Sequence, residues 1–521
     1  MLSAILVVVD GLRPEYLGCY GNSWVSTPNW NRLAAEGFVF DHCLAAEQDP
    51  VKAFRSLLAG RHPAFFSREV RSDTIADGGG VLMTAPLIQS VERNGGSSLL
   101  VTDDPRFFQD PSAQWFETVQ LVSGRRVETP ATDSWEAILA GLPPTPCADW
   151  AETWTAGFFS QASDLLTGLK DRPFFLCCHL GGFSRIWDCP MEFRERYQEE
   201  GDPPPWNGVS APRHFFPPGA DPDSWLPFVQ TYAGQVVLLD LCLGGLLQAI
   251  SMSGLDKRCV LALTGLGGYP LAEHGWLGLW RMVPRNERVG CPLVLRFPDR
   301  VGASDRSHAL CYLHDLAPTL NEAVGNSNVS SDPRGESSGQ TGGANAVTVV
   351  AESAIAPVRD ADGTSLMPII RGEAEQVRER LFCCCDDPAA TAIRTASWFA
   401  VVDMSADLQA FDRGPMEAAS ESARPTATAF ADPCAESVST HPIDQGAAAP
   451  DLERMLDLAT VRRIVELYVK PHDRWEMNDV ADRCPEAAAA AIRQTLAFRR
   501  LVNGELSTMP PLDPELTERL S

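Results

Sequence analysis

The chain has 521 residues, a formal net charge of −25 and 45% hydrophobic residues, a composition typical of a soluble globular protein too long for one compact core. This acidic balance argues against a nucleic-acid partner, which would require a basic face. We find no apolar run that approaches the roughly 20 residues of a membrane span. We therefore expect no membrane partner and, from the acidic charge, no nucleic-acid partner.

The start of the chain and its cysteines bear on the compartment. No charged region, apolar core and cleavage site precede the first apolar run, which predicts a cytoplasmic protein. We therefore expect its fifteen cysteines to be mostly reduced thiols. Neighbouring residues on a strand point to opposite faces, so we interpret Cys177-Cys178 and the run Cys383 to Cys385 as buried residues rather than metal ligands.

The first element is the run Ser3 to Asp10, SAILVVVD, which leads directly into Gly11. An unbroken aliphatic run of this length that ends in an acid and a glycine predicts a strand buried on both faces of a parallel sheet. Ligands bind at the carboxyl ends of such strands. Asp10 lies at that end, where a carboxylate is either a site residue or the cap of the following turn.

Two helices are predicted next. Thr27 is a favourable N-cap, Pro28 suits the first turn and Gly37 suits the position after the last turn, which together predict a helix over 27–37. The second half of residues 45–60, AAEQDPVKAFRSLLAG, also has a helical pattern. This segment follows the first strand and the first predicted helix in the chain.

Strand-like runs then alternate with helical patterns, of which residues 228–250 are the clearest. The alternation predicts a doubly wound, mostly parallel α/β sheet flanked by helices over residues 1–325. The predicted strands lie at 4–9, 98–102, 173–179, 259–264 and 292–297.

The chain changes character after residue 325. Residues 326–353 are rich in Ser, Gly and Asn and predict a low-complexity insertion. Residues 354–380 join the core to a smaller carboxyl-terminal α+β subdomain at 381–521, which contains a second low-complexity insertion at 405–450. Within the subdomain we predict strands at 381–385, 391–403 and 463–469 and a helix at 486–501.

Several segments in order resemble the sulfatase family of the alkaline phosphatase superfamily, and the likeness covers nearly the whole chain. The segments are ILVVVDGLRPEYLGCYGN, TPNWNRLAAEGFVFDHC, SLLAGRHP, FSRIWDCP, YPLAEHG, LHDLAPTL, DGTSLMPIIRGE, AIRTASWFAVV and ELYVKPHDRWEMND. The resemblance implies the α/β fold predicted above and a hydrolase-like protein acting on sulfuric esters.

The family's cation site is not matched. The resemblance implies a divalent cation, usually calcium, held by two consecutive aspartates after the first strand and by an Asp with an Asn or His after a later strand. Here the first pair reads Asp10-Gly11, and the later pair falls on Leu266-Gly267. Calcium requires several oxygen ligands. We therefore expect no cofactor, because Asp10 alone remains.

The family's nucleophile is also missing. In sulfatases the first residue of C-x-P-x-R or S-x-P-x-R is oxidised to formylglycine, and superfamily relatives use an unmodified Thr or Ser. Counted back from Leu57-Leu58-Ala59-Gly60, this position is Pro50, which has no nucleophilic side chain. A shift of one residue would offer Asp49.

Further site groups differ from the family pattern. Ser184 stands at the position of the site histidine, and Arg281 corresponds loosely to the lysine after the EHG block. Arg106 stands where one branch has a histidine. We interpret His274 as packing beside the site and His179 as a core histidine.

Two interpretations follow from these losses. In the first, the chain is a catalytically inactive pseudo-sulfatase with a binding or regulatory role. In the second, it hydrolyses sulfate or phosphate esters with a divergent nucleophile, a reaction that needs concentrated positive charge on the developing oxyanions. A version of the first is a module that binds a small anionic ligand or a protein partner. The residues that could supply positive charge are Lys52, Arg55, Arg106, Arg185 and Arg281.

Overall fold

A large sheet forms the centre of the molecule. Its strands are β1 (Ser3–Gly11), β2 (Phe38–Leu44), β3 (Ser97–Thr102), β4 (Thr118–Leu121), β5 (Phe174–Leu180), β7 (Cys259–Gly268), β9 (Gly290–Arg296) and β10 (Arg306–Tyr312). They form an eight-stranded sheet in the order β10-β2-β9-β7-β1-β5-β3-β4. Among the described strands of this sheet, β9 alone runs antiparallel to both of its neighbours. The predicted mostly parallel sheet with residues 4–9 at its centre is therefore confirmed.

The computed structural model defines most of the chain. The described residues are 2–66, 85–122, 135–169, 172–279, 283–325, 362–385, 390–403 and 465–517. The two predicted low-complexity insertions, at 326–353 and 405–450, lie outside these residues. The domain boundaries at 325, 353 and 380 stay predictions.

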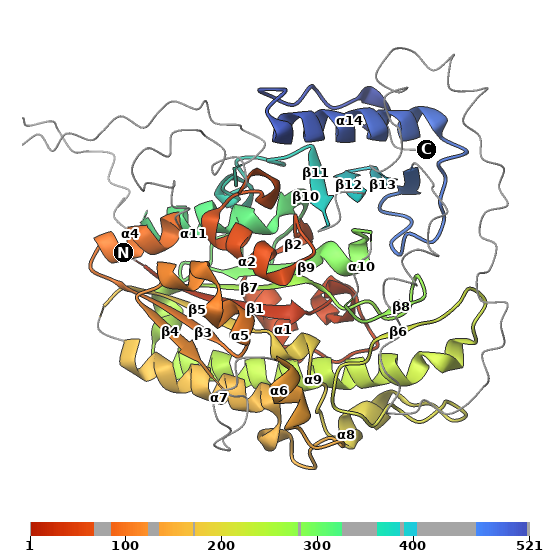
Figure 1. Ribbon diagram of the computed structural model, residues 1–521. Helices are drawn as coiled ribbons and strands as arrows, with labels where there is room; N and C mark the ends of the chain where they lie inside the picture. Colours follow the sequence, from red (N-terminus) through yellow and green to blue (C-terminus); the bar gives the residue numbers. More distant parts are fainter. Residues whose placement is uncertain are drawn as a thin grey trace, which may run out of the picture.

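Helices cover both faces of the sheet (Figure 1). Their bounds are α1 (Pro28–Glu36), α2 (Pro50–Ala59), α4 (Pro86–Arg93), α5 (Pro105–Gln109), α6 (Trp135–Ala140), α7 (Trp154–Leu166), α8 (Met191–Arg194), α9 (Leu226–Met252), α10 (Asn286–Val289), α11 (Leu316–Gly325), α12 (Met367–Ile370) and α14 (Pro485–Asn503). Helices α1, α7 and α9 pack on one face. Helices α2, α4 and α11 pack on the other.

The pattern of β1 explains why it lies in the middle. Its alternate residues Ile5, Val7 and Val9 enter the core under α7 and α9, whereas Ala4, Leu6 and Val8 enter the core under α2 and α11. An apolar residue at every position is what a strand covered on both faces requires. The same alternation sends Cys178 into the first core and Cys177 into the second, so the prediction that these two thiols face apart is confirmed.

Helix α9 contradicts the sequence-based statement that no apolar run approaches the length of a membrane span. It has 27 residues, and its most apolar stretch has a mean hydropathy of 1.7, so among the described residues it alone has the length and apolarity of a membrane span. However, 67% of that stretch is buried inside the protein. Helix α9 lies against α1 and α7 as a core helix (Figure 1).

The ends of α1 also differ from the prediction. The Thr27 side chain makes no capping bond to the helix, because its hydroxyl accepts from the Gly18 amide at 2.8 Å. The Asp240 carboxylate of α9 caps the helix instead, accepting from the Trp30 amide at 2.9 Å. Gly37 has an extended backbone. It must be glycine because a Cβ there would collide with the Leu295 carbonyl oxygen.

The carboxyl-terminal unit is an antiparallel sheet with one long helix against it. Strands β11 (Arg380–Cys384), β12 (Ala390–Thr395), β13 (Trp398–Asp403) and β14 (Val465–Val469) pair in that order, and α14 packs on them (Figure 1). The predicted α+β unit is therefore confirmed. The predicted single strand at 391–403 is a hairpin, because its chain reverses between β12 and β13.

Candidate functional site

The carboxyl ends of β1, β5 and β7 lie together at one edge of the central sheet, because β1 is parallel to both neighbours. The register between β1 and β7 pairs Val9 with Gly265 and Gly11 with Gly268, with an irregularity between them. Asp10 therefore lies opposite Leu266-Gly267. These are the positions from which the sequence resemblance implies a cation site.

Asp10 is completely buried and has one direct side-chain partner. Its Oδ2 accepts a hydrogen bond from the Ser184 hydroxyl at 3.0 Å, and Ser184 follows β5 in a short 3₁₀ turn, η7 (Gly182–Ser184). The other oxygen, Oδ1, has no hydrogen-bond partner among the described residues. Burial raises the pKa of the Asp10 carboxyl, while the charges of Arg288, Arg106 and Arg185 and the Ser184 bond act in the opposite direction.

The other expected ligand positions cannot hold a cation. Gly11 has φ +86°, and a Cβ on it would lie 2.9 Å from the Ser184 Cβ. Gly267 has φ +123°, and a Cβ on it would collide with the Arg288 carbonyl oxygen. The Leu266 side chain is buried in the apolar core. The residues present therefore do not fit the calcium ion that the resemblance implies, since hard cations need several oxygen ligands.

A guanidinium group lies beside the end of β7. Arg288, in α10, is 4% exposed. Its Nη1 donates to the Gly268 carbonyl at 3.0 Å and its Nη2 donates to the Gln48 carbonyl at 2.6 Å. Its Nε has no hydrogen-bond partner within the described chain. The side chain thus joins the end of β7 to the loop that precedes α2.

Pro50 is the first residue of α2 and is buried. A proline is well suited to this position, because its fixed φ matches the helix and the missing N–H has no helical partner there. The preceding Asp49 is the N-cap, and its carboxylate accepts from the Lys52 amide at 2.9 Å. Both residues therefore begin the helix, and the carboxylate of Asp49 is engaged with the backbone.

Two further arginines approach Asp10 from the ends of β3 and β5. Arg106, in α5, forms an ion pair with Asp104 at 2.6 Å, with about a third of its side chain exposed. Burial acts to lower the pKa of Arg106, but Asp104 raises it. Arg185 is half-buried, and its Nε has no partner among the residues that the structure describes. Burial and the charge of Arg106 lower its pKa.

The end of β3 supplies two acids with structural partners. The Asp103 carboxylate accepts from the amides of Gly181 and Gly182 and from the Trp154 indole. Burial raises the pKa of Asp103 to about 7. Asp104 holds Arg106 as described above. These bonds fix the loop that carries Ser184 against the loop that carries Arg106.

His179 and His274 have separate roles. His179 is fully buried, stacks on Phe107 with ring centroids 3.8 Å apart, and bonds Thr102 through Nδ1 at 2.9 Å. Burial lowers the pKa of His179 to about 3, so its ring is neutral. His274 lies at the contact with the carboxyl-terminal unit, where it bonds Glu287 at 2.7 Å and the Glu476 carbonyl at 3.0 Å.

The other basic residues named from the sequence differ in whether they lie near Asp10 and its arginines. The Arg55 guanidinium pairs with Asp110 at 2.5 Å. Lys52 lies exposed on the first turn of α2. Arg281 lies outside the described residues. Sequence reasoning missed Arg288: it stands as a charged residue just before the apolar run at 292–297, but nothing in the local sequence identifies its partners.

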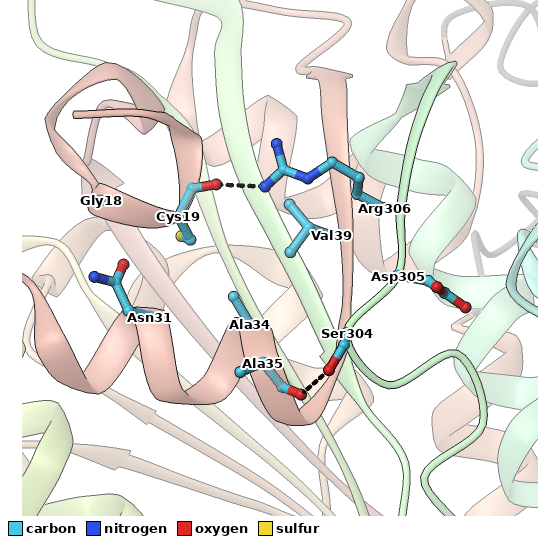
Figure 2. A pocket seen from close by; sticks show the side chains of 9 residues that line it. All are labelled: Gly18, Cys19, Asn31, Ala34, Ala35, Val39, Ser304, Asp305 and Arg306. Atoms are coloured by element: carbon cyan, nitrogen blue, oxygen red, sulfur yellow. Dashed lines mark hydrogen bonds between the residues drawn. The ribbon is translucent and has the colours of Figure 1, made fainter. Parts of the chain in front are cut away.

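A shallow pocket of about 310 Å³ lies apart from this edge, between α1, β2 and β10. Figure 2 shows its lining, in which the guanidinium of Arg306 donates to the Cys19 carbonyl at 2.6 Å and the Ser304 hydroxyl donates to the Ala35 carbonyl at 2.7 Å. These polar groups hold neighbouring elements together. We therefore interpret the pocket as a gap between packed elements rather than as a binding site.

Comparisons with known proteins agree with the fold and the motifs. A family model described as Sulfatase matches residues 3–326. Iduronate 2-sulfatase of Homo sapiens is 27% identical over 316 residues, which cover 53% of this chain and 56% of that protein. Arylsulfatase D of Homo sapiens is 23% identical over 458 residues, covering 73% of this chain and 70% of that protein. The match thus spans little more than half of iduronate 2-sulfatase.

A solved structure gives the same result for the fold. The phosphonate monoester hydrolase of Agrobacterium radiobacter superposes with a TM-score of 0.59 at 17% identity, over 97% of this chain and 96% of that chain. At this identity the likeness concerns the fold alone.

Proposed function

Because this chain belongs to the sulfatase family of the alkaline phosphatase superfamily, we propose that it is a pseudo-sulfatase, which keeps the fold, has lost ester hydrolysis and uses the old catalytic edge for binding. The observation that carries the proposal is Pro50 at the nucleophile position, built into the first turn of α2. A proline side chain offers no atom that can attack sulfur or phosphorus.

The surroundings of Pro50 support the same conclusion. The cation positions offer the Asp10 carboxylate, two glycines and a core leucine, so an organised metal site is not available to stabilise a developing oxyanion. Asp49, the nearest alternative nucleophile, caps α2 through the Lys52 amide. The charged groups at this edge are suited to holding an anion, which supports a binding role.

The compartment belongs to the same proposal. Among the described residues all fourteen cysteines are free thiols, and such thiols are typical of a reducing compartment. We therefore propose a cytoplasmic location. Fractionation of cells that express the tagged chain, with a cytosolic and a secreted marker, tests it directly.

The test of the inactive state is a turnover assay on the purified full-length chain. Incubation with 4-nitrophenyl sulfate or 4-nitrophenyl phosphate, with calcium, with magnesium or with EDTA, is expected to release 4-nitrophenol at the rate of buffer alone. The variant Pro50→Cys is expected to remain at that rate, because catalytic groups act as a unit and the cation site is still missing. An active sulfatase serves as the positive control.

Turnover by the wild-type chain would contradict the proposal if it persisted through repeated purification and disappeared in Asp49→Asn or Asp10→Asn. That result would support the divergent hydrolase instead. The amide variants keep the shape of each side chain, so a loss of turnover would report the lost charge rather than a packing defect.

A further inference from the structure

Arg288 contacts the end of β7, the strand end from which the sequence resemblance implies ligands to a divalent cation. We propose that the Arg288 guanidinium is a permanent substitute for the family's cation, so that this edge of the sheet binds a sulfate or phosphate group without any divalent metal. The proposal rests on the pseudo-sulfatase assignment, since a metal-dependent hydrolase would need the ion itself.

The first step of the argument concerns position. Asp10 lies opposite Leu266-Gly267 through the register of β1 and β7. The Nη1 of Arg288 donates to Gly268, the next residue of β7, and its charge acts on Asp10 more strongly than that of any other arginine. The guanidinium therefore lies beside the strand end that, in the family pattern, would share a metal ion with the carboxylate.

The second step concerns the two glycines. A Cβ on Gly267 would meet the backbone of Arg288, and its φ of +123° excludes most side chains. A Cβ on Gly11 would lie 2.9 Å from Ser184. The Gly267 Cβ would also lie 3.4 Å from the Arg288 Nη1, so the end of β7 fits closely against the arginine, whereas Gly11 is restricted by Ser184. At Gly267, Arg288 thus takes up the room that the side chain of a metal ligand would need.

The third step concerns how an anion would be held. Arg288 is almost fully buried and fixed by two carbonyls, so it supplies positive charge at the base of the site. Arg185 is half-buried and keeps an Nε without a partner in the described chain, and Arg106 exposes about a third of its side chain. Both charges also act on Asp10, so in this proposal the two guanidiniums contact the oxyanion from the solvent side. Planar guanidinium donors match the oxygens of sulfate and phosphate.

The experiment is calorimetric titration of the full-length chain, first freed of metal with EDTA, using inorganic sulfate, inorganic phosphate and 4-nitrophenyl sulfate as separate probes. We expect saturable binding of at least one probe, with an affinity changed less than about twofold by millimolar calcium. Titration with calcium alone is expected to give no saturable heat. Comparison of the inorganic ions with the ester distinguishes a free anion from an ester as the source of the group.

Variants assign the binding to the arginines. Arg288→Met removes the positive charge at the base of the site, and Arg185→Gln removes a charge-assisted hydrogen bond, so each is expected to weaken anion binding by about tenfold or more. Arg306→Met, which removes a half-exposed arginine at a different place, is the matched control and is expected to bind like the wild type. If Arg288→Met does not fold, Arg185→Gln and the metal comparison still decide the matter.

Each result has a definite meaning. Binding that requires calcium, binding that survives both arginine variants, or no binding of any probe in the folded wild type overturns the inference. Those outcomes leave the proposed loss of ester hydrolysis standing, since that part of the proposal fails only if the chain turns over an ester. Conversely, turnover that depends on calcium would defeat both proposals in one measurement.

Discussion

The two glycines beside Asp10 show why the lost cation site cannot be restored by one substitution. Gly11 and Gly267 stand at positions where the family pattern has carboxylates or an amide that hold the ion. Here each has a positive φ, and each faces atoms that leave no room for a Cβ. An acidic side chain would therefore strain the backbone before it could supply an oxygen to a cation.

We predict that Gly267→Asp destabilises the protein and creates no calcium site. A residue with a side chain at this φ costs about 1–3 kcal/mol, and the collision with the Arg288 carbonyl adds to that cost. The measurement is the free energy of unfolding by urea, together with calorimetric titration of calcium. Gly219→Asp is the matched control, because Gly219 has φ +82° and open space around it.

The difference between the two variants reports the collision together with the larger backbone strain at φ +123° than at φ +82°. Equal destabilisation of both, or saturable calcium binding by Gly267→Asp, would show that the strand end can adapt to a ligand. Either result would contradict the inference that Arg288 takes up the room that a ligand side chain at Gly267 would need.

The site also shows what a sequence can reveal at single positions. Asp10 was predictable as a residue at a strand end, because a run buried on both faces that stops at an acid and a glycine has few other interpretations. Arg288 was not, because its role depends on the Gln48 carbonyl, 240 residues away in the chain. The long side chain crosses between two elements that only the fold brings together.

At the scale of elements, local signals predicted where α1 lies but not what stabilises its end. Thr27 and Pro28 indicate the start of a helix correctly, yet the hydroxyl of Thr27 serves Gly18. The four first N–H groups of a helix must find acceptors, and two of them, those of Asn29 and Trp30, are satisfied by Asp240. The cap therefore comes from α9.

We predict that Asp240→Ala lowers the free energy of unfolding by about 1–3 kcal/mol, because it removes the cap of α1 and leaves buried amides without an acceptor. The measurement is urea denaturation followed by fluorescence. Gln248→Ala, an exposed change on the same helix, is the control and is expected to stay within about 0.5 kcal/mol of the wild type. Indistinguishable values for the two variants would mean that Asp240 does not cap the helix.

Strands were easier to predict where they are central than where they lie near an edge. The five predicted strands of the main sheet include β1, β5 and β7, whose apolar runs face cores on both sides. In contrast, β2 and β10 carry polar residues such as Asp41, His42 and Arg306 that face outward or pair with one another. A mixed pattern of that kind gives no clear period, so these strands were missed.

On the scale of the whole molecule, the two sheets meet through an apolar layer and a set of buried charges. Leu44 and Tyr312 from the main sheet pack with Leu381 and Phe399 from the second sheet. Beside this layer, Glu287 of α10 and the chain at Glu476 are joined by His274, which bonds both. The histidine therefore connects the block after β7 with the carboxyl-terminal unit.

The ionisation of this pair makes the contact sensitive to pH. Burial acts to lower the pKa of His274, but the hydrogen bond and charge of Glu287 raise it above the usual value of about 6.5. Burial acts to raise the pKa of Glu287, but His274 lowers it below its usual range. Both groups are therefore charged between the lowered value of Glu287 and the raised value of His274.

A raised histidine pKa adds stability that is fully present below the unfolded value of about 6.5 and is lost as the pH rises through the folded value. We predict that the difference in urea midpoint between the wild type and His274→Gln is largest near pH 6 and shrinks toward pH 9, where the neutral imidazole keeps its hydrogen bonds but loses the ionic contribution. His308→Gln, at a largely exposed histidine paired with Asp41, is the control and should show a much smaller change. A difference that grew with rising pH would have the opposite sign from the one that a charged His274 facing Glu287 requires, and would mean that the histidine enters this contact as a neutral ring.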